Sequence, residues 1–215
     1  MLTIKFVIIY ILISSCIIYL SIYLRYFDKP NKRGIHRTPT INTGGLIIYF
    51  FFLSVISQDE FNHNVELIVS IGFFVCIAGF IDDRVNLTPS SKIVLIIIPS
   101  IYLILNGISI DNLGQYEYLG SLELGKFKIP FLLLAIGLLI NATNYIDGID
   151  GLLLIFFISC LIYYIFLIDD IQTINLLKLF VIASFLNLIL NLLPSKNKFK
   201  VFSGDSGSLF IGFFI

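Results

Sequence analysis

Seven apolar segments, of which the second and third are short, follow one another along this 215-residue chain and constrain its fold more than any other feature. A helix that crosses a bilayer needs about 20 mostly apolar residues, with a range of about 17 to 25. Because 58% of the residues are hydrophobic and only 13% are charged, polar side chains are too few to cover a soluble protein of this length. The sequence therefore predicts an all-α polytopic membrane protein. Its segments are residues 4–24, 44–57, 66–81, 92–110, 129–146, 151–168 and 174–193, with the start of an eighth at 208–215.

The connections between these segments complete the expected architecture. Residues 1–215 are expected to form a single integral-membrane domain. Residues 111–128 alternate polar and apolar side chains around glycines, which predicts an external β-hairpin. The chain has no net formal charge, so no nucleic-acid partner is expected, because such binding needs a basic face.

The cations indicate the orientation in the membrane. If each segment crosses once, the odd-numbered connections share one side, and that side carries ten of the 14 Lys and Arg residues. Cytoplasmic loops carry an excess of Lys and Arg, so the odd connections are predicted to be cytoplasmic. The basic run "KPNKRGIHR" at 29–37 contributes to this excess. A topology signal or a lipid-headgroup contact explains that run better than a phosphate site.

Five aspartates stand at the ends of apolar segments. An even number of crossings separates them, so all five are expected on the same, cytoplasmic side, whichever way the chain is oriented. Carboxylates gathered at neighbouring helix ends repel one another unless a divalent cation lies among them. Mg²⁺ takes one or two carboxylates and fills its other positions with water and substrate phosphate oxygens. The five are Asp82, Asp83, Asp147, Asp150 and Asp205.

Two polar motifs interrupt the apolar pattern on that side. In "NATNYIDGIDGL", amides and carboxylates recur every three residues, a spacing that keeps them close on one helix face. Gly148 then allows a ligand to approach the main chain closely. In "SGDSGSLF", Gly204 and Ser206 flank an aspartate at a helix start, where free N–H groups favour phosphate. Ordinary turns and helix caps explain each motif taken alone, but they explain three acidic motifs on one side of a membrane less well.

At these residues the sequence resembles the polyprenyl-phosphate N-acetylhexosamine-1-phosphate transferases. The stretches "DKPNKRGIHRTPTINTGGL", "GFIDDR", "NATNYIDGIDGL" and "KVFSGDSGSLFIGF" carry the resemblance across nearly the whole chain. It implies a Mg²⁺-dependent enzyme of the bacterial inner membrane with a cytoplasmic active site. Such an enzyme transfers a sugar-1-phosphate from a UDP-sugar to polyprenyl phosphate and releases UMP, which initiates lipid-linked glycan synthesis at the cell envelope. A homodimer is compatible with these expectations.

The resemblance also assigns roles to individual residues. Asp82 and Asp83 match the catalytic pair near the lipid phosphate, with the first as base. Asn144 and Asp205 match the metal ligands. The expected substrate-binding residues are Asn141, Asp147, Gly148, Asp150, Gly204 and Ser206.

The chain departs from the family pattern in two ways. Many relatives place a basic residue near Ser90, a role that Lys92 is expected to take here. Relatives also continue through further helices to a His-rich loop, so the chain resembles a C-terminally truncated member. A catalytically inactive membrane fragment is therefore one alternative. A carboxylate-based transporter is another, although it would need charges in mid-helix.

Overall fold

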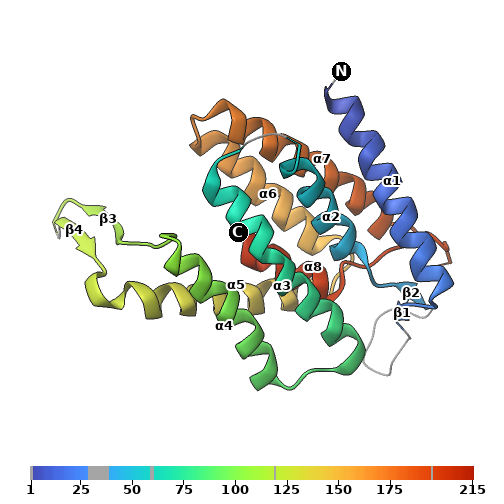
Figure 1. Ribbon diagram of the computed structural model, residues 1–215, viewed down its shortest axis with the longest axis horizontal. Helices are drawn as coiled ribbons and strands as arrows, with labels where there is room; N and C mark the ends of the chain where they lie inside the picture. The colour runs from blue at the N-terminus through green and yellow to red at the C-terminus, as the bar shows by residue number, and fades with distance from the viewer. Residues whose placement is uncertain (1, 29–38, 59–60, 119, 195) are drawn as a thin grey trace.

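The computed structural model describes the chain except for residues 1, 29–38, 59–60, 119 and 195. The described residues form eight α-helices and four short strands (Figure 1). The helices are α1 (Leu2–Tyr23), α2 (Gly44–Ile56), α3 (His63–Val85), α4 (Pro89–Leu105), α5 (Lys128–Ile146), α6 (Leu152–Leu167), α7 (Ile171–Asn191) and α8 (Gly204–Phe214). The strands are β1 (Phe27–Asp28), β2 (Thr40–Ile41), β3 (Asn112–Tyr116) and β4 (Gly120–Glu123), and a 3-10 turn covers Gly125–Phe127. The predicted fold class is confirmed.

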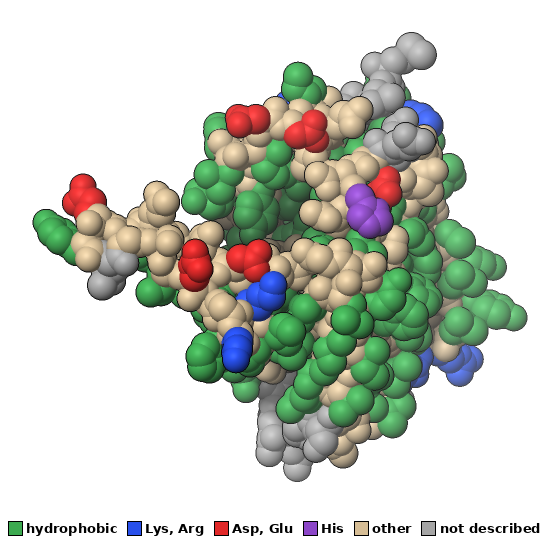
Figure 2. Space-filling model, turned by 60° about the vertical axis from the view of Figure 1, so that its left-hand side comes forward, with side chains coloured by type: hydrophobic (Ala, Val, Ile, Leu, Met, Phe, Trp, Pro, Cys, Tyr) green, Lys and Arg blue, Asp and Glu red, His purple; other side chains and the backbone are tan. Residues whose placement is uncertain are grey.

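The helices identify the chain as an integral membrane protein. Within the described ranges, four are long and apolar enough to cross a membrane, namely Ile4–Tyr23, His63–Val85, Gly125–Ile146 and Ile171–Asn191. The other three apolar helices are shorter, covering Gly44–Ile56, Ser91–Leu105 and Leu152–Leu167. Figure 2 shows hydrophobic side chains over much of one face of the helices, as expected for a surface in contact with lipid.

Several helices extend beyond the predicted apolar segments, and two of these extensions affect the acidic residues. The third segment was expected at 66–81, but α3 runs from 63 to 85. The side chain of Asn62 caps its start by accepting the N–H of Asn64 at 2.9 Å, and Asn86 ends it in a left-handed conformation with φ 51°. Asp82 and Asp83 therefore lie inside the last turns of α3. The eighth segment was expected at 208–215, but α8 begins at Gly204, so Asp205 is in its first turn.

The strands form two separate antiparallel pairs. β3 and β4 form the predicted hairpin, which projects with α4 and α5 away from the other helices (Figure 1). β1 and β2 were not predicted; they pair Phe27 with Ile41, and Ile41 also bridges to Val201 just before α8. The segments after α1 and before α8 therefore lie side by side. The basic run at 29–37 is outside the described residues.

Helix α8 lies at the centre of the helices, and nine of its residues are buried. Phe210 and Phe214 pack edge-on against Phe52 of α2, whose ring stacks on Phe180 of α7 with centroids 3.5 Å apart. Glycines allow the backbone of α8 to approach its neighbours closely. A Cβ atom at Gly45 of α2 would clash with the backbone of Gly207, and one at Gly79 of α3 would clash with the backbone of Asp205. The first turn of α8 is therefore held against the ends of α2 and α3.

Candidate active site

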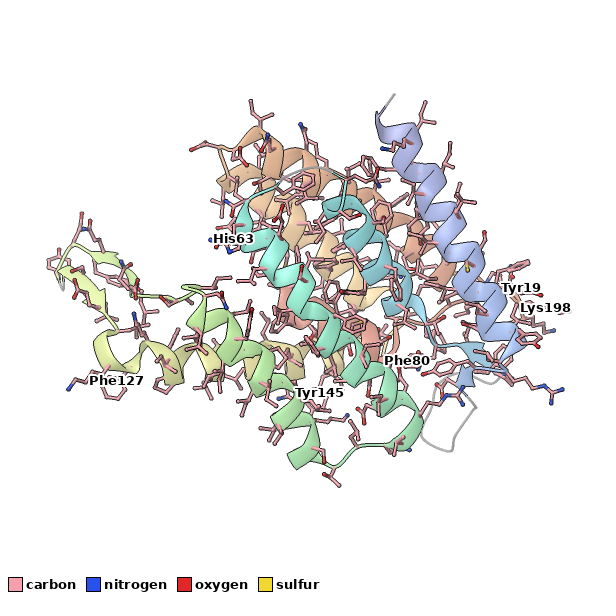
Figure 3. The ribbon with its side chains drawn as sticks, in the orientation of Figure 1. Tyr19, His63, Phe80, Phe127, Tyr145 and Lys198 are labelled. Atoms are coloured by element: carbon pink, nitrogen blue, oxygen red, sulfur yellow. The ribbon has the colours of Figure 1, made fainter. Side chains whose placement is uncertain are left out.

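The polar residues of the site gather around the first turn of α8. The end of α3 supplies Asp82 and Asp83, and the end of α5 supplies Asn144 and Asp147. Figure 3 labels Phe80 and Tyr145, which mark these two helix ends. Aspartates from three regions far apart in the sequence therefore lie together at the start of α8, whereas Asp150, the fifth of the predicted group, pairs with Lys200.

Asp83 holds the start of α8. Its Oδ1 accepts hydrogen bonds from the side-chain amide of Asn42 at 2.9 Å and from the main-chain N–H of Asp205 at 3.1 Å. The main-chain N–H of Ser206 lies near this carboxylate and favours its charged form. Its Oδ2 is buried and has no hydrogen-bond partner among the described residues. Asp83 thus uses Oδ1 to hold α8 and leaves Oδ2 without a hydrogen bond from the described residues.

Asp205 is contacted from two other helices. The side-chain amide of Asn144 donates to its Oδ1 at 2.8 Å, and the same amide donates to Ser208 Oγ at 3.0 Å. Lys92 Nζ of α4 lies 3.5 Å from its Oδ2. The two expected metal ligands, Asn144 and Asp205, are therefore adjacent. Because the amide donates through its nitrogen, the carbonyl oxygen of Asn144 remains free to act as a ligand.

Asp82 points to the other side of the same lysine. It is 3% exposed, and its Oδ2 forms an ion pair with Lys92 Nζ. Its Oδ1 accepts the main-chain N–H of Leu87 at 2.7 Å, so it also holds the turn between α3 and α4. Lys92 was expected to replace a basic residue near Ser90, and the structure places its ammonium group between Asp82 and Asp205.

Asp147 completes the acidic cluster from the turn after α5. The Ser203 hydroxyl and the Gly204 main-chain N–H lie beside its carboxylate and favour its charged form. Burial, together with the nearby charges of Asp205 and Asp83, raises the pKa of Asp147 well above its usual value. A group in this position is stabilised by a proton or by a bound cation.

The first turn of α8 was expected to keep its N–H groups free for a substrate phosphate. The main-chain N–H of Asp205 instead donates to Asp83 Oδ1 at 3.1 Å. The N–H groups of Gly204 and Ser206 lie near the carboxylates of Asp147 and Asp83. A phosphate contact of these two residues stays a prediction.

Three expected substrate-binding residues lie outside this cluster. Asn141 is exposed and its amide donates to the Gly137 carbonyl one turn earlier. Gly148 is exposed in the turn between α5 and α6. Asp150 accepts from Lys200 Nζ at 2.5 Å, on the loop between α7 and α8. The structure does not bring these three residues into contact with the carboxylate cluster, and their roles stay predictions.

Several residues of the site were not singled out in the sequence. Asn42 follows β2 and orients Asp83, and Ser203 contacts Asp147. Thr143 donates to the Ser208 carbonyl at 2.8 Å, which ties α5 to α8. Thr143 and Ser208 lie in the motifs "NATNYIDGIDGL" and "SGDSGSLF", but only their contacts in the structure show that they belong to the site. Asn42 lies in an "NTGG" stretch whose position beside α3 depends on tertiary structure.

The donor set fits a hard divalent cation. Among the described residues, the acidic cluster contains Asp82, Asp83, Asp147 and Asp205, and only Lys92 forms ion pairs with it. The buried, unpartnered Oδ2 of Asp83 has no counter-charge in hydrogen-bonding contact. No group of three His, Cys, Asp or Glu among the described residues is arranged to hold a metal ion by itself. Mg²⁺ does not need such a group, because it is commonly bound through one or two carboxylates with water and substrate phosphate.

Comparisons with known proteins identify the family of this chain. A model of the family described as glycosyl transferase family 4 matches residues 65–215. The chain is 28% identical over 211 residues to a probable undecaprenyl-phosphate N-acetylglucosaminyl 1-phosphate transferase of Bacillus subtilis, covering 95% of this chain and 58% of the relative. It is 30% identical over 201 residues to the undecaprenyl-phosphate alpha-N-acetylglucosaminyl 1-phosphate transferase of Yersinia pestis, covering 90% of this chain and 54% of that protein.

A third relative gives the same result. The undecaprenyl-phosphate alpha-N-acetylglucosaminyl 1-phosphate transferase of Escherichia coli K12 is 29% identical over 195 residues, which cover 86% of this chain and 52% of the relative. The chain thus spans little more than half the length of the curated relatives it matches. Since the family model matches more than half of the chain and includes α3, α5 and α8, this protein belongs to glycosyl transferase family 4.

Proposed function

We propose that this chain is the part of a membrane-bound transferase that moves a sugar-1-phosphate from a UDP-sugar to polyprenyl phosphate, with release of UMP. The sugar is an N-acetylhexosamine, as in the names of the relatives. One observation carries the proposal: in a chain of this family, Asp83, Asn144, Asp147 and Asp205 gather at the start of α8. The site lies on the cytoplasmic side of a bacterial inner membrane, where the positive-inside rule puts the aspartate ends of the helices.

The reaction is a phosphoryl transfer. An oxygen of the polyprenyl phosphate attacks the β-phosphorus of the UDP-sugar, the bond from that phosphorus to the bridging oxygen breaks, and UMP leaves with the bridging oxygen. Positioning and neutralisation of charge supply most of the catalysis in this chemistry. Mg²⁺ bound by Asp205 and the carbonyl oxygen of Asn144 would neutralise pyrophosphate charge.

The protein side chains have distinct tasks in this scheme. Lys92 is about one third exposed and lies between two carboxylates, so its ammonium group can approach a phosphate oxygen without leaving Asp82. Asp83 keeps α8 in place through Oδ1 and presents Oδ2 to the site. Asp82 is paired and buried, which favours a positioning role over that of a base.

The alternative of a carboxylate-based transporter is less well supported. The aspartates of the site stand at helix ends and not in the middle of the spans, whereas proton and ion relays need charged groups inside the membrane. The bilayer, the UDP-sugar and the polyprenyl phosphate are therefore the proposed partners, and a homodimer is compatible with them.

The decisive experiment follows both products. The purified protein is incubated with polyprenyl phosphate, Mg²⁺ and a UDP-N-acetylhexosamine labelled in both the uridine and the sugar. The expected products are a lipid-diphosphate-sugar and UMP. Release of UDP would mean transfer of the sugar alone and would contradict the proposal, as would equal turnover in excess chelator.

A further inference from the structure

A cavity lies beside the loop that leads into α8. It has a volume of about 500 Å³ and lies between the end of α1 and the loop joining α7 to α8. One wall is apolar, the other carries three lysines, and none of the described residues lining it has a carboxyl group. The lining residues are Ile22, Phe27, Pro39, Thr40, Ile41, Lys196, Asn197, Lys198 and Lys200. None of them belongs to the carboxylate cluster.

Two of the three lysines have charge available for a ligand. Lys200 is buried, pairs with Asp150 at 2.5 Å and lies over the ring of Phe202. Lys196 and Lys198 are exposed, and neither forms an ion pair with a residue in the described part of the chain. An anion entering the cavity would therefore meet two lysines that form no ion pair with any described residue.

The cavity opens where α1 leaves the membrane. Ile22 belongs to the last turn of the span Ile4–Tyr23. Around it, Tyr19 is 68% exposed and Tyr23 is 74% exposed, and tyrosine is enriched at the boundary between hydrocarbon and headgroups. Figure 3 shows Tyr19 and Lys198 at the same end of the molecule, the first from α1 and the second from the loop before α8.

We propose that this cavity binds the phosphate of an anionic phospholipid. Lys196 and Lys198 contact the phosphate, and Ile22 and Phe27 contact the apolar part of the lipid next to its headgroup. The apolar wall and the exposed end of the span favour a lipid over a soluble phosphate, which would leave that wall without a partner. Basic pockets at the cytoplasmic ends of membrane helices are suited to such headgroups. The proposal does not depend on the transferase activity.

Lipid titration of the purified chain, followed by native mass spectrometry, tests this site. Phosphatidylglycerol is the anionic probe and phosphatidylcholine the zwitterionic one. In the double variant K196Q/K198Q, we expect the affinity for phosphatidylglycerol to fall about 30-fold. Each lysine near an anionic headgroup contributes somewhat more than fivefold, and the two factors multiply. The affinity for phosphatidylcholine should stay the same. K196R/K198R keeps both charges and should bind like the wild type.

The matched control is K126Q/K178Q, which removes the same charge from lysines outside the cavity. It should bind phosphatidylglycerol like the wild type. Equal loss in this control, or binding by K196Q/K198Q within threefold of the wild type, would overturn the proposal. So would displacement of phosphatidylglycerol by millimolar inorganic phosphate or UMP, because the occupant would then be a soluble phosphate. Melting curves without lipid check the fold, and if the double variant is unfolded, K196Q and K198Q singly should each lose about fivefold.

Discussion

Asp83 near the end of α3 accepts the main-chain N–H of Asp205 in the first turn of α8 at 3.1 Å, across 122 residues of sequence. A carboxylate at the N-terminus of a helix is stabilised by the helix dipole and by the free N–H groups there. This hydrogen bond therefore positions two proposed site residues with respect to each other. It also links the geometry of the site to the packing of α8.

Replacing Asp205 tests the proposed metal ligand. We expect Asp205→Asn to reduce Mg²⁺-dependent transfer by about 100-fold or more, a typical cost of removing one charge-stabilising group from a site. Membrane insertion should be unchanged, which the amount of protein in the membrane fraction checks. Asp111→Asn is the control, because Asp111 is an exposed hairpin residue paired with Lys128. Activity of the Asp205 variant within a few-fold of wild type would exclude a principal role as ligand.

Lys92 should contribute to stability as well as to charge balance. Lys92→Gln leaves the buried Asp82 without its ion-pair partner, which costs about 3–5 kcal/mol in a fully buried pair. Because the Lys92 side chain is 31% exposed, water reduces the cost, and we expect about 1–3 kcal/mol. Lys128→Gln, which breaks the exposed pair with Asp111, should cost less than about 1 kcal/mol.

Adding Asp82→Asn to Lys92→Gln should recover part of the loss, because the uncompensated charge is then removed. Chemical denaturation of the four proteins in detergent gives the coupling energy between Asp82 and Lys92. A double variant as unstable as the sum of the two single variants would show that the two side chains do not interact.

Asp147 should make the stability of the metal-free protein depend on pH. Its pKa in the folded protein is well above the value of about 3.9 for an unfolded chain, so the folded state favours the protonated form. The contribution of Asp147 to the free energy of unfolding is therefore fully present below about pH 4 and is lost as the pH rises toward its folded pKa. In chelator, Asp147→Asn should lessen this fall in melting temperature between pH 5 and pH 8. An unchanged pH profile would mean that ionisation of Asp147 does not cause the loss of stability.

Gly79 tests the close contact between α3 and α8. Gly79→Ala puts a Cβ atom against the backbone of Asp205, and overpacking of this kind costs about 1–3 kcal/mol. The displaced first turn of α8 should reduce transfer activity as well. Gly137→Ala is the matched control, since a Cβ there meets nothing within 4 Å, and it should be neutral or slightly stabilising. If both variants melt at the wild-type temperature, α3 and α8 are not packed as closely as the structure shows.

The sequence predicted the helices and most of the carboxylate cluster, for a physical reason. Apolar length fixes the crossings, and the parity of the crossings fixes which of Asp82, Asp147 and Asp205 share a side. The same reasoning extended to Asp150 but could not foresee its pairing with Lys200, because that depends on how the α7–α8 loop folds. Parity selects a face of the membrane, not neighbours on that face.

The central position of α8 could not be predicted from the sequence either. Its apolar residues predict burial but not which helices cover them, and the glycines of α2 and α3 that admit it are far away in the chain. For the same reason Asn42 was missed, since nothing in "NTGG" indicates contact with Asp83. Likewise, nothing in the sequence shows that the Asp205 N–H donates to Asp83, because that bond exists only once α8 is packed against α3.

The order of the elements has a consequence for biosynthesis. Helices α1 to α7 leave the ribosome before α8, so Asp83 and Asp147 enter the membrane region without the N–H groups that later bind them. Until residues 204–214 arrive, water must solvate these carboxylates, which favours keeping the ends of α3 and α5 at the bilayer surface. Helix α8 then closes the gap between them, so the acidic cluster is completed only after α1 to α7 have been synthesised.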